Sequence, residues 1–109
     1  MRIIEPFRNY FWDFYKPLSR RDKSKVDYVL QIVISSERIP SKFFKHIEEG
    51  IYEIRIEVGG NNYRIFTFFE DNKLVILLHG IQKKRMKIPG KEILRAKKLR
   101  KEFYDEKKN

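Results

Sequence analysis

The sequence contains no cysteine, only two histidines, and no apolar run that approaches the ~20 residues of a membrane-spanning helix. The absence of cysteine excludes disulfide bonds and thiolate metal sites and favours a reducing compartment, so we expect a cytoplasmic protein. The histidines lie 33 positions apart with no carboxylate cluster beside them. This spacing matches no metal-ligand pattern, and we expect neither a metal nor another cofactor. We also expect no signal peptide and no membrane partner.

Acidic residues are scarce in one part of the chain. The sequence has 25 Lys and Arg against 15 Asp and Glu, a formal net charge of +10. Residues 1–80 carry 13 basic and 11 acidic side chains, whereas residues 81–109 carry 12 and 4, a local net charge of +8. A localised basic field indicates a polyanionic partner, of which nucleic acid is the commonest. A solvated basic face without a partner is the alternative interpretation.

The segment from Gly50 to Lys87 contains three runs rich in β-branched and aromatic residues. Gly59-Gly60-Asn61-Asn62 and Asp71-Asn72 separate them, and Gly, Asn and Asp tolerate the backbone angles of tight hairpin turns. The pattern predicts an antiparallel three-stranded meander over about 51–58, 62–70 and 73–80. A length of 109 residues suits one domain, 1–109, and a hydrophobic content of 41% is sufficient for a core.

The segments before the meander predict two helices. Aromatic residues recur at helical spacing at Phe7, Tyr10, Phe11 and Phe14, between Pro6 in the first turn and Pro17 at the end. Ser19 and Asp22 resemble a capping box that opens a second helix ending near Ser36. The two helices would form an αα-hairpin. Residues 1–5 would form a short edge strand, and residues 41–50 a connector with a surface histidine.

After the meander, Pro89 and Gly90 precede a predicted basic helix with Glu92 in its first turn. The predicted fold class is therefore α+β. It consists of an N-terminal αα-hairpin packed on a twisted antiparallel sheet, a possible N-terminal edge strand, and a basic C-terminal helix.

Hairpin register places two arginines and a histidine in one row. Two-residue turns at Gly59-Gly60 and Asp71-Asn72 would set Arg55 opposite Arg64 and Arg64 opposite His79, all on one face. A three-residue loop would break this row. The other face would be the core side, lined by Tyr52, Ile54, Ile56, Val58, Tyr63, Ile65, Phe69, Leu74, Ile76 and Leu78.

Two interpretations of the arginine face stay open. Paired arginines repel unless an anion lies between them, and Glu53 and Glu57 on the same face would provide an Arg–Glu lattice. The alternative anion is a phosphate. Arginine, lysine and histidine suffice for metal-free RNA cleavage, in which the ribose 2′-OH attacks its own phosphate. Arginine would neutralise the developing oxyanion, and His79 or a lysine would transfer the protons.

Four segments resemble a known family. They are Gly50-Ile51-Tyr52-Glu53-Ile54-Arg55, Tyr63-Arg64-Ile65-Phe66, Leu77-Leu78-His79-Gly80-Ile81-Gln82-Lys83-Lys84, and Pro89 followed by Glu92, Ile93 and Ala96. In this order and spacing they resemble the RelE/HigB toxin superfamily, and within it the HigB-like, phage-derived branch of type II toxin–antitoxin systems. The resemblance covers nearly the whole chain.

The resemblance implies a RelE-like toxin that cleaves mRNA in the ribosomal A site, and a small helix-turn-helix antitoxin that neutralises it. By motif position, Arg55 and Arg64 would bind phosphate and stabilise the transition state, and Lys83 and Lys84 would border the site. The expected catalytic residues are Arg55, Arg64, His79 and Lys84, and the expected RNA-binding residues are Lys83, Arg85, Lys87, Lys97, Lys98 and Lys101.

The sequence is compatible with two functions, one catalytic and one limited to binding. The first is a metal-independent mRNA endonuclease. The second is a basic RNA- or ribosome-binding module without chemistry, such as a decayed toxin. A DNA-binding protein is disfavoured because no helix-turn-helix pattern is present.

Overall fold

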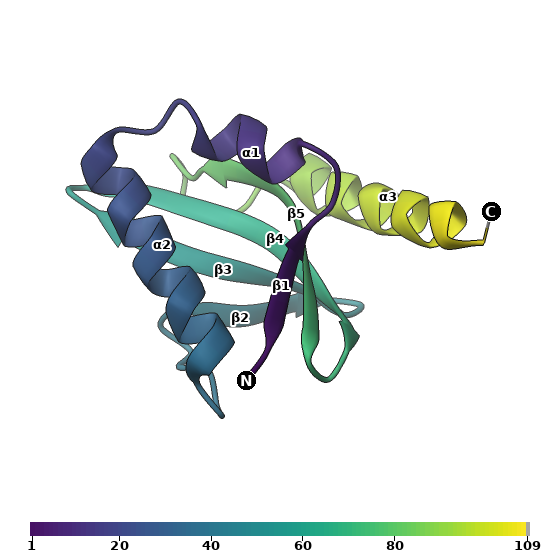
Figure 1. The fold of residues 1–109 in the computed structure, drawn as a ribbon. Coiled ribbons are helices and arrows are strands. Elements are labelled where there is room, and N and C mark those ends of the chain that lie inside the picture. The colour runs from purple at the N-terminus through teal and green to yellow at the C-terminus, as the bar shows by residue number, and fades with distance from the viewer. Residues whose placement is uncertain (109) are drawn as a thin grey trace.

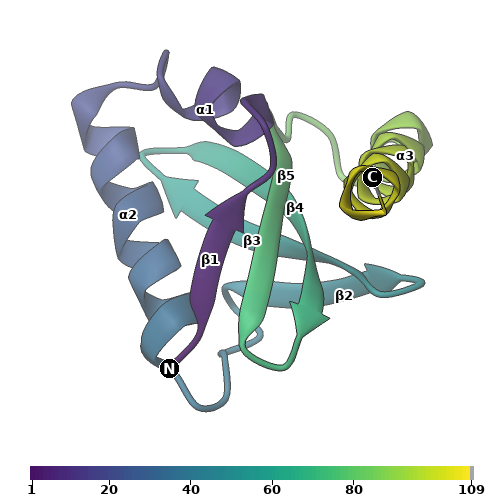
Figure 2. The ribbon, with the colours of Figure 1, turned by 45° about the vertical axis from the view of Figure 1, so that its right-hand side comes forward.

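The computed structural model of the protein describes residues 1–108, and its strands form one five-stranded sheet. The elements are β1 (Ile3–Pro6), α1 (Tyr10–Tyr15), α2 (Arg20–Ser35), β2 (Phe44–Glu48), β3 (Ile51–Val58), β4 (Asn61–Asp71), β5 (Leu74–Gln82) and α3 (Gly90–Lys107). The strand order is β1-β5-β4-β3-β2, with α1 and α2 on one face and α3 on the other (Figure 1 and Figure 2). None of the helices in the described part of the chain has the length and apolarity needed to span a membrane.

β3, β4 and β5 form the predicted meander, but the sheet is mixed rather than antiparallel. The predicted N-terminal edge strand exists as β1, yet it runs parallel to β5, with Ile3 beside Leu74. Pro6 ends this strand, whereas the sequence placed it in a helix. Proline is tolerated there because an edge strand has a free side that needs no amide hydrogen. The strand direction continues to Phe7, whose amide donates to the carbonyl of Leu77 at 2.9 Å.

The predicted connector over residues 41–50 contains a fifth strand that the sequence did not indicate. β2 pairs antiparallel with β3, and the ring of Phe44 stacks on that of Tyr52 at 4.8 Å. Charged residues interrupt the apolar pattern of this strand, so its periodicity is weak. His46 is exposed, as predicted, and its Nε2 accepts a hydrogen bond from the amide of Gly50.

The two N-terminal helices both pack on the sheet, although α1 is shorter than predicted. Of the predicted helix, only the six residues of α1 are helical, and Phe11 is the buried residue of α1. α2 begins as predicted, because the Ser19 hydroxyl accepts the amide of Asp22. The Tyr15 hydroxyl joins the helices by donating to the Asp27 carboxylate at 2.8 Å.

A buried carboxylate attaches α2 to the hairpin between β3 and β4. Asp22 accepts hydrogen bonds from the hydroxyl of Tyr63, the side-chain amide of Asn61 at 3.0 Å and the guanidinium of Arg21 at 3.0 Å. The bonds from Tyr63 and Asn61, with a smaller contribution from Arg21, lower the pKa of Asp22 to about 2. This network fixes the position of the hairpin that carries Arg64.

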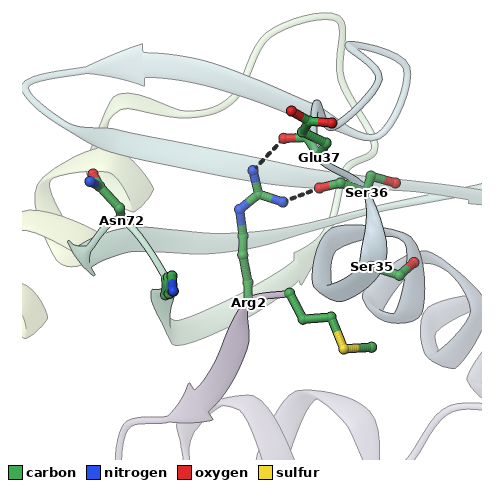
Figure 3. A pocket seen from close by; sticks show the side chains of 7 residues that line it. Arg2, Ser35, Ser36, Glu37 and Asn72 are labelled. Atoms are coloured by element: carbon green, nitrogen blue, oxygen red, sulfur yellow. Dashed lines mark hydrogen bonds between the residues drawn. The ribbon is translucent and has the colours of Figure 1, made fainter.

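The other end of α2 is capped by the N-terminal segment. Figure 3 shows the guanidinium of Arg2 reaching the backbone oxygens of Ser36 and Glu37, and it also donates to the carbonyl of Val33 at 3.2 Å. A positive charge at a helix C-terminus satisfies free carbonyl groups and complements the helix dipole. Arg2 also lines a hollow of about 450 Å³, but its charge already serves the helix end.

Each face of the sheet has its own apolar cluster. The cluster under α1 and α2 contains Phe11, Val26, Val29, Leu30, Val33, Ile54, Ile56, Tyr63, Ile65, Val75 and Leu77. The cluster under α3 contains Phe7, Ile51, Phe66, Phe68, Ile76, Leu78, Ala96 and Leu99. The predicted core face is right for β3 and β4 but wrong for β5, where Ile76 and Leu78 face α3 while Val75 and Leu77 face α1 and α2.

The reversed face of β5 near its turn follows from an irregularity in its pairing with β4. The turn lies one residue later than predicted, since Asp71 pairs with Leu74 and its carboxylate accepts the amides of Lys73 and Leu74. The register then shifts between Phe69 and Asp71 and again between Ile65 and Thr67. The later turn alone moves the pairing by two residues and keeps the predicted faces. The first shift then exchanges the two faces, because a slip of one residue does so, and the second shift restores them.

α3 is held to the rest of the chain by ion pairs around a small apolar contact. Only Ala96 and Leu99 are fully buried in it. Arg8 pairs with Glu102 at 2.6 Å and also with Glu106, and Lys107 pairs with Glu70 at 2.6 Å. Of these pairs, that of Lys107 neutralises a basic residue of the C-terminal segment, whereas those of Arg8 neutralise two of its acidic residues.

Candidate functional site

Arg55 and Arg64 stand directly opposite each other on β3 and β4, as the two-residue turn predicts. Val58 pairs with Asn61 at the turn, and Gly59 and Gly60 supply its two positive φ angles, 54° and 84°. Both arginines belong to the sheet face on which α3 lies, away from α1 and α2, because their neighbours on each strand belong to the opposite cluster.

Glu53 lies between the two arginines and balances part of their charge. Its Oε2 is 2.9 Å from Nε of Arg64, and its Oε1 is 4.0 Å from Nε of Arg55. Glu53 is 7% exposed, and neither its Oε2 nor Nε of Arg64 has a well-directed hydrogen bond. The contact is therefore a close Coulombic pair rather than a linear hydrogen bond. One part of the predicted Arg–Glu lattice is present.

Arg64 is held rigidly, whereas Arg55 reaches solvent. Arg64 is 2% exposed, and its Nη1 donates to the carbonyl of Tyr63 at 2.9 Å. Burial lowers the pKa of Arg64, Glu53 opposes that effect, and Arg55 adds to it. Arginine nevertheless remains protonated in proteins. The Arg55 side chain is 31% exposed. The pair thus combines one buried, fixed positive charge with one that solvent can reach.

The arginine pair lines a hollow of about 520 Å³. Its lining residues are Arg55, Glu57, Asn62, Arg64, Lys83, Lys84, Arg85 and Met86. The loop after β5 reaches this place because the amide of Lys83 donates to the carbonyl of Asn62 at 2.7 Å and continues the pairing of β5 with β4. Five cationic side chains therefore surround one concavity, where the two lysines lie beside the arginines as expected.

A second hollow of about 280 Å³ lies on the other side of the same loop. It is lined by Ile81, Gln82, Lys83, Lys84, Arg85, Lys87, Pro89, Lys91 and Glu92. Lys83, Lys84 and Arg85 line both hollows, so they form a cationic ridge between them. The predicted RNA-binding residues Arg85 and Lys87 lie in this region. The sequence reasoning did not single out Lys91.

His79 does not lie opposite Arg64, and this part of the predicted row is wrong. Ile81 occupies that position because the turn before β5 lies one residue later than predicted, which moves the partner of Arg64 by two residues. His79 still lies on the predicted face, toward α3. His79 is 2% exposed and lines neither hollow. Its ring stacks on that of Phe66 at 4.6 Å, and its Nε2 lies 3.2 Å from Oε1 of Glu92 on α3.

Burial lowers the pKa of His79 to about 4, and the nearby charge of Arg95 acts in the same direction, while Glu92 opposes both. His79 is therefore neutral at pH 7, and its Nδ1 is buried without a hydrogen-bond partner among residues 1–108. A neutral, covered imidazole connects the sheet to the first turn of α3. The hollow contains the arginines but not the histidine that the sequence placed with them.

The predicted RNA-binding residues of α3 differ in their availability. Lys97 pairs with Glu48 and Glu49, and Lys101 pairs with Asp105 at 2.8 Å. Lys98 is exposed and has no ion-pair partner in the described part of the chain. Of the three lysines, Lys98 is thus the one whose charge is free for a partner.

Glu57 and Asn62 line the hollow that contains Arg55 and Arg64, called the arginine hollow below, but no functional role was predicted for them from the sequence. They pair with each other across β3 and β4, two residues from Arg55 and Arg64. Side chains two residues apart on a strand share one face. The register that brought the arginines together was therefore sufficient to place Glu57 and Asn62 beside them. Among residues 1–108, no group of three or more His, Asp or Glu side chains is placed to hold a metal ion.

The fold and site define a small α+β protein with a cationic concavity at one end of a mixed sheet. The family model described as phage-derived protein Gp49-like (DUF891) matches residues 13–101. The chain belongs to this family. The family is toxin-like and falls within the broad RelE/HigB area, which agrees with the sequence resemblance at that level and implies an antitoxin partner. No protein of known, curated function matches the chain.

Proposed function

We propose that this protein is the toxin of a type II toxin–antitoxin system and acts as a ribosome-dependent, metal-independent mRNA endonuclease. Its partners would be mRNA, the ribosome and a small helix-turn-helix antitoxin, all in the cytoplasm. The observation that supports this proposal best is the pairing of Arg55 with Arg64 beside the cationic ridge of Lys83, Lys84 and Arg85 in one hollow of about 520 Å³. Membership of a toxin-like family supports the same conclusion.

In the proposed reaction, the ribose 2′-oxygen attacks the adjacent phosphorus, and the bond from phosphorus to the 5′-oxygen breaks. The products are a 2′,3′-cyclic phosphate and a free 5′-hydroxyl. Arg55, at the rim, would bind the phosphate, and Arg64 would supply a fixed positive charge at the floor. Charges that are already oriented and shielded from water stabilise a developing oxyanion without reorganisation. The ammonium group of Lys84 would give a proton to the departing 5′-oxygen.

The role that the sequence suggested for His79 is reassigned in this proposal. A general acid must reach the leaving oxygen directly or through one water molecule. His79 is covered by α3, is neutral at pH 7 and is absent from the lining of the hollow. We therefore propose that His79 holds Glu92 and the start of α3 in place, and that Lys84 is the proton donor.

The test is cleavage of a translated mRNA on purified ribosomes, read by primer extension, together with ribosome binding. Arg64→Ala should reduce the cleavage rate by roughly 10²–10³, as loss of an oxyanion contact does, while binding changes much less. Arg64→Lys should be nearly as slow, because an ammonium cannot reproduce the geometry of a guanidinium. Arg38→Ala is the matched control, since it removes an exposed arginine that lies outside both hollows.

Folding of the Arg64 variants must be verified by circular dichroism and urea titration, because Arg64 is buried. A folded Arg64→Ala variant that cleaves as fast as Arg38→Ala would refute the catalytic assignment. If the wild type binds ribosomes but never cleaves, the alternative is correct, namely a non-catalytic RNA- or ribosome-binding module.

A further inference from the structure

Glu57 is the one acidic residue among those that line the arginine hollow, and its charge acts on Arg64 only at longer range. Glu57 is exposed, it lines the hollow with five cations, and it forms no ion pair within residues 1–108. Glu53 already lies between Arg55 and Arg64 and balances their charge. A second carboxylate beside an anion site repels the phosphate and weakens binding. Burial lowers the pKa of Arg64 and the charge of Glu57 opposes that effect, but no ion pair within residues 1–108 holds the Glu57 carboxylate, which is therefore free to act on a ligand.

The register places Glu57 across the hollow from the cationic ridge. Glu57 pairs with Asn62 on β4, and Asn62 in turn receives the backbone hydrogen bond of Lys83 at the end of β5. The three residues thus form a row across adjacent strands, and strands are spaced by about 5 Å, so Glu57 and Lys83 are separated by about 10 Å at the backbone. Arg55 and Arg64 form the next row on the same face.

This arrangement has the polarity that phosphoryl transfer within RNA requires. The attacking 2′-oxygen and the leaving 5′-oxygen lie on opposite sides of the phosphorus, so the proton acceptor and the proton donor must also lie on opposite sides. A carboxylate on β3 and an ammonium after β5, with guanidinium groups beside them, satisfy that condition.

We propose that Glu57 is the general base of the cleavage reaction, a catalytic role that rests on the proposed function. Its carboxylate removes the proton from the ribose 2′-hydroxyl as the 2′-oxygen forms its bond to phosphorus. The bond from phosphorus to the 5′-oxygen breaks, and that oxygen takes a proton from Lys84. Glu57 then releases its proton to solvent and Lys84 takes one up from solvent, so the reaction consumes no co-reactant.

The test compares Glu57→Gln with Glu37→Gln, which makes the same change of charge at an exposed glutamate outside the hollow. General-base catalysis contributes typically about 10²–10⁴ in rate. We expect Glu57→Gln to lose cleavage by a factor in this range under single-turnover conditions, while ribosome binding is unchanged or tighter. Glu57→Asp should retain part of the rate, because it keeps the base but shortens its reach.

The dependence of the cleavage rate on pH distinguishes Glu57 as a general base from Glu57 as a counterion. With Glu57 as base, the wild-type rate falls toward acidic pH, and Glu57→Gln lacks that decline. A Glu57→Gln variant that binds more tightly and cleaves at the wild-type rate would overturn the proposal and leave Glu57 as a counterion. In that case a defective Arg64→Ala variant would still support the endonuclease. A wild type that never cleaves would overturn both proposals.

Discussion

The buried histidine should make the stability of the fold depend on pH between 7 and 5. His79 is almost completely covered, stacks on Phe66 and contacts Glu92, while Arg95 adds a repulsive positive charge. Burial is the main reason that its pKa falls from 6.5 to about 4. The perturbation is His79→Gln, which removes the titrating ring but keeps a polar side chain that can reach Glu92.

The direction in which stability changes with pH follows from proton binding by the folded and unfolded chains. Below pH 6.5 the unfolded chain protonates this histidine, whereas the folded chain does so only near pH 4. Stability is therefore complete above pH 6.5 and is lost progressively as the pH falls to about 4. For these two pKa values the free energy of unfolding should decrease by about 2 kcal/mol between pH 7 and pH 5. Most carboxylates remain ionised in this window and contribute little to the change.

The assay is urea unfolding followed by circular dichroism at pH 7, 6 and 5, for the wild type and two variants. His79→Gln is expected to be less stable at pH 7, because it loses the stacked ring, but to show only a small change with pH. His46→Gln, which alters the exposed histidine, should keep the wild-type dependence. Equal losses of stability in the wild type and in His79→Gln would refute the reasoning, since the dependence would then come from other groups.

Two further predictions concern other contacts. Tyr63→Phe removes the hydroxyl that donates to Asp22, and a hydrogen bond to a charged group contributes about 1.5–3 kcal/mol, so the urea midpoint should fall at an unchanged slope. An unchanged midpoint would show that Asp22 needs only its other partners. Lys84→Gln should lower the salt dependence of RNA binding by about 0.7 in log–log slope. Lys97→Gln should change that slope little, because Lys97 is already paired with Glu48; equal effects of the two variants would contradict this difference.

The sequence predicted the paired arginines because their turn depends on local residues alone. Gly59 and Gly60 adopt the positive φ angles of a two-residue turn, and every pairing along β3 and β4 follows from it. The cap of α2 was predictable for the same reason, since Ser19 and Asp22 are three residues apart. Features fixed by contacts within a few residues leave a pattern that can be read without knowledge of the fold.

The position of His79 along β5 was predicted wrongly because the second turn was set one residue too early. The carboxylate of Asp71 accepts the amides of Lys73 and Leu74 and moves this turn by one residue, which moves the partner of Arg64 by two. The two irregularities beyond the turn cancel before Arg64, but between them they exchange the faces of β5. Tertiary packing also acts on this part of β5, because a Cβ at Gly80 would lie 2.5 Å from the ring of Phe14 on α1. Packing against a helix 66 residues earlier therefore constrains β5 at this point. No turn rule contains that information.

The direction of β1 and the existence of β2 were not predicted, for a related reason. A strand of four or five residues gives too few alternations to reveal its face or its partner. The direction of β1 depends on β5, about 70 positions later, with which it pairs. Charged residues in β2 lower its apparent strand propensity, yet Phe44 stacks on Tyr52 and supplies the contact that orders it. Both edges of the sheet are thus determined by their neighbours.

The distribution of charge in the structure also decides where a polyanion would bind. The sequence places most of the net charge after residue 80, which suggests that the whole C-terminal helix attracts RNA. On α3, however, Lys97 and Lys107 already pair with glutamates of the sheet and its connecting turns, so a phosphate there would have to replace an existing partner. Lys83, Lys84 and Arg85 form no ion pair within residues 1–108 and line both hollows. A polyanion would therefore be drawn to the ridge beside the arginine pair, where the proposed chemistry would take place.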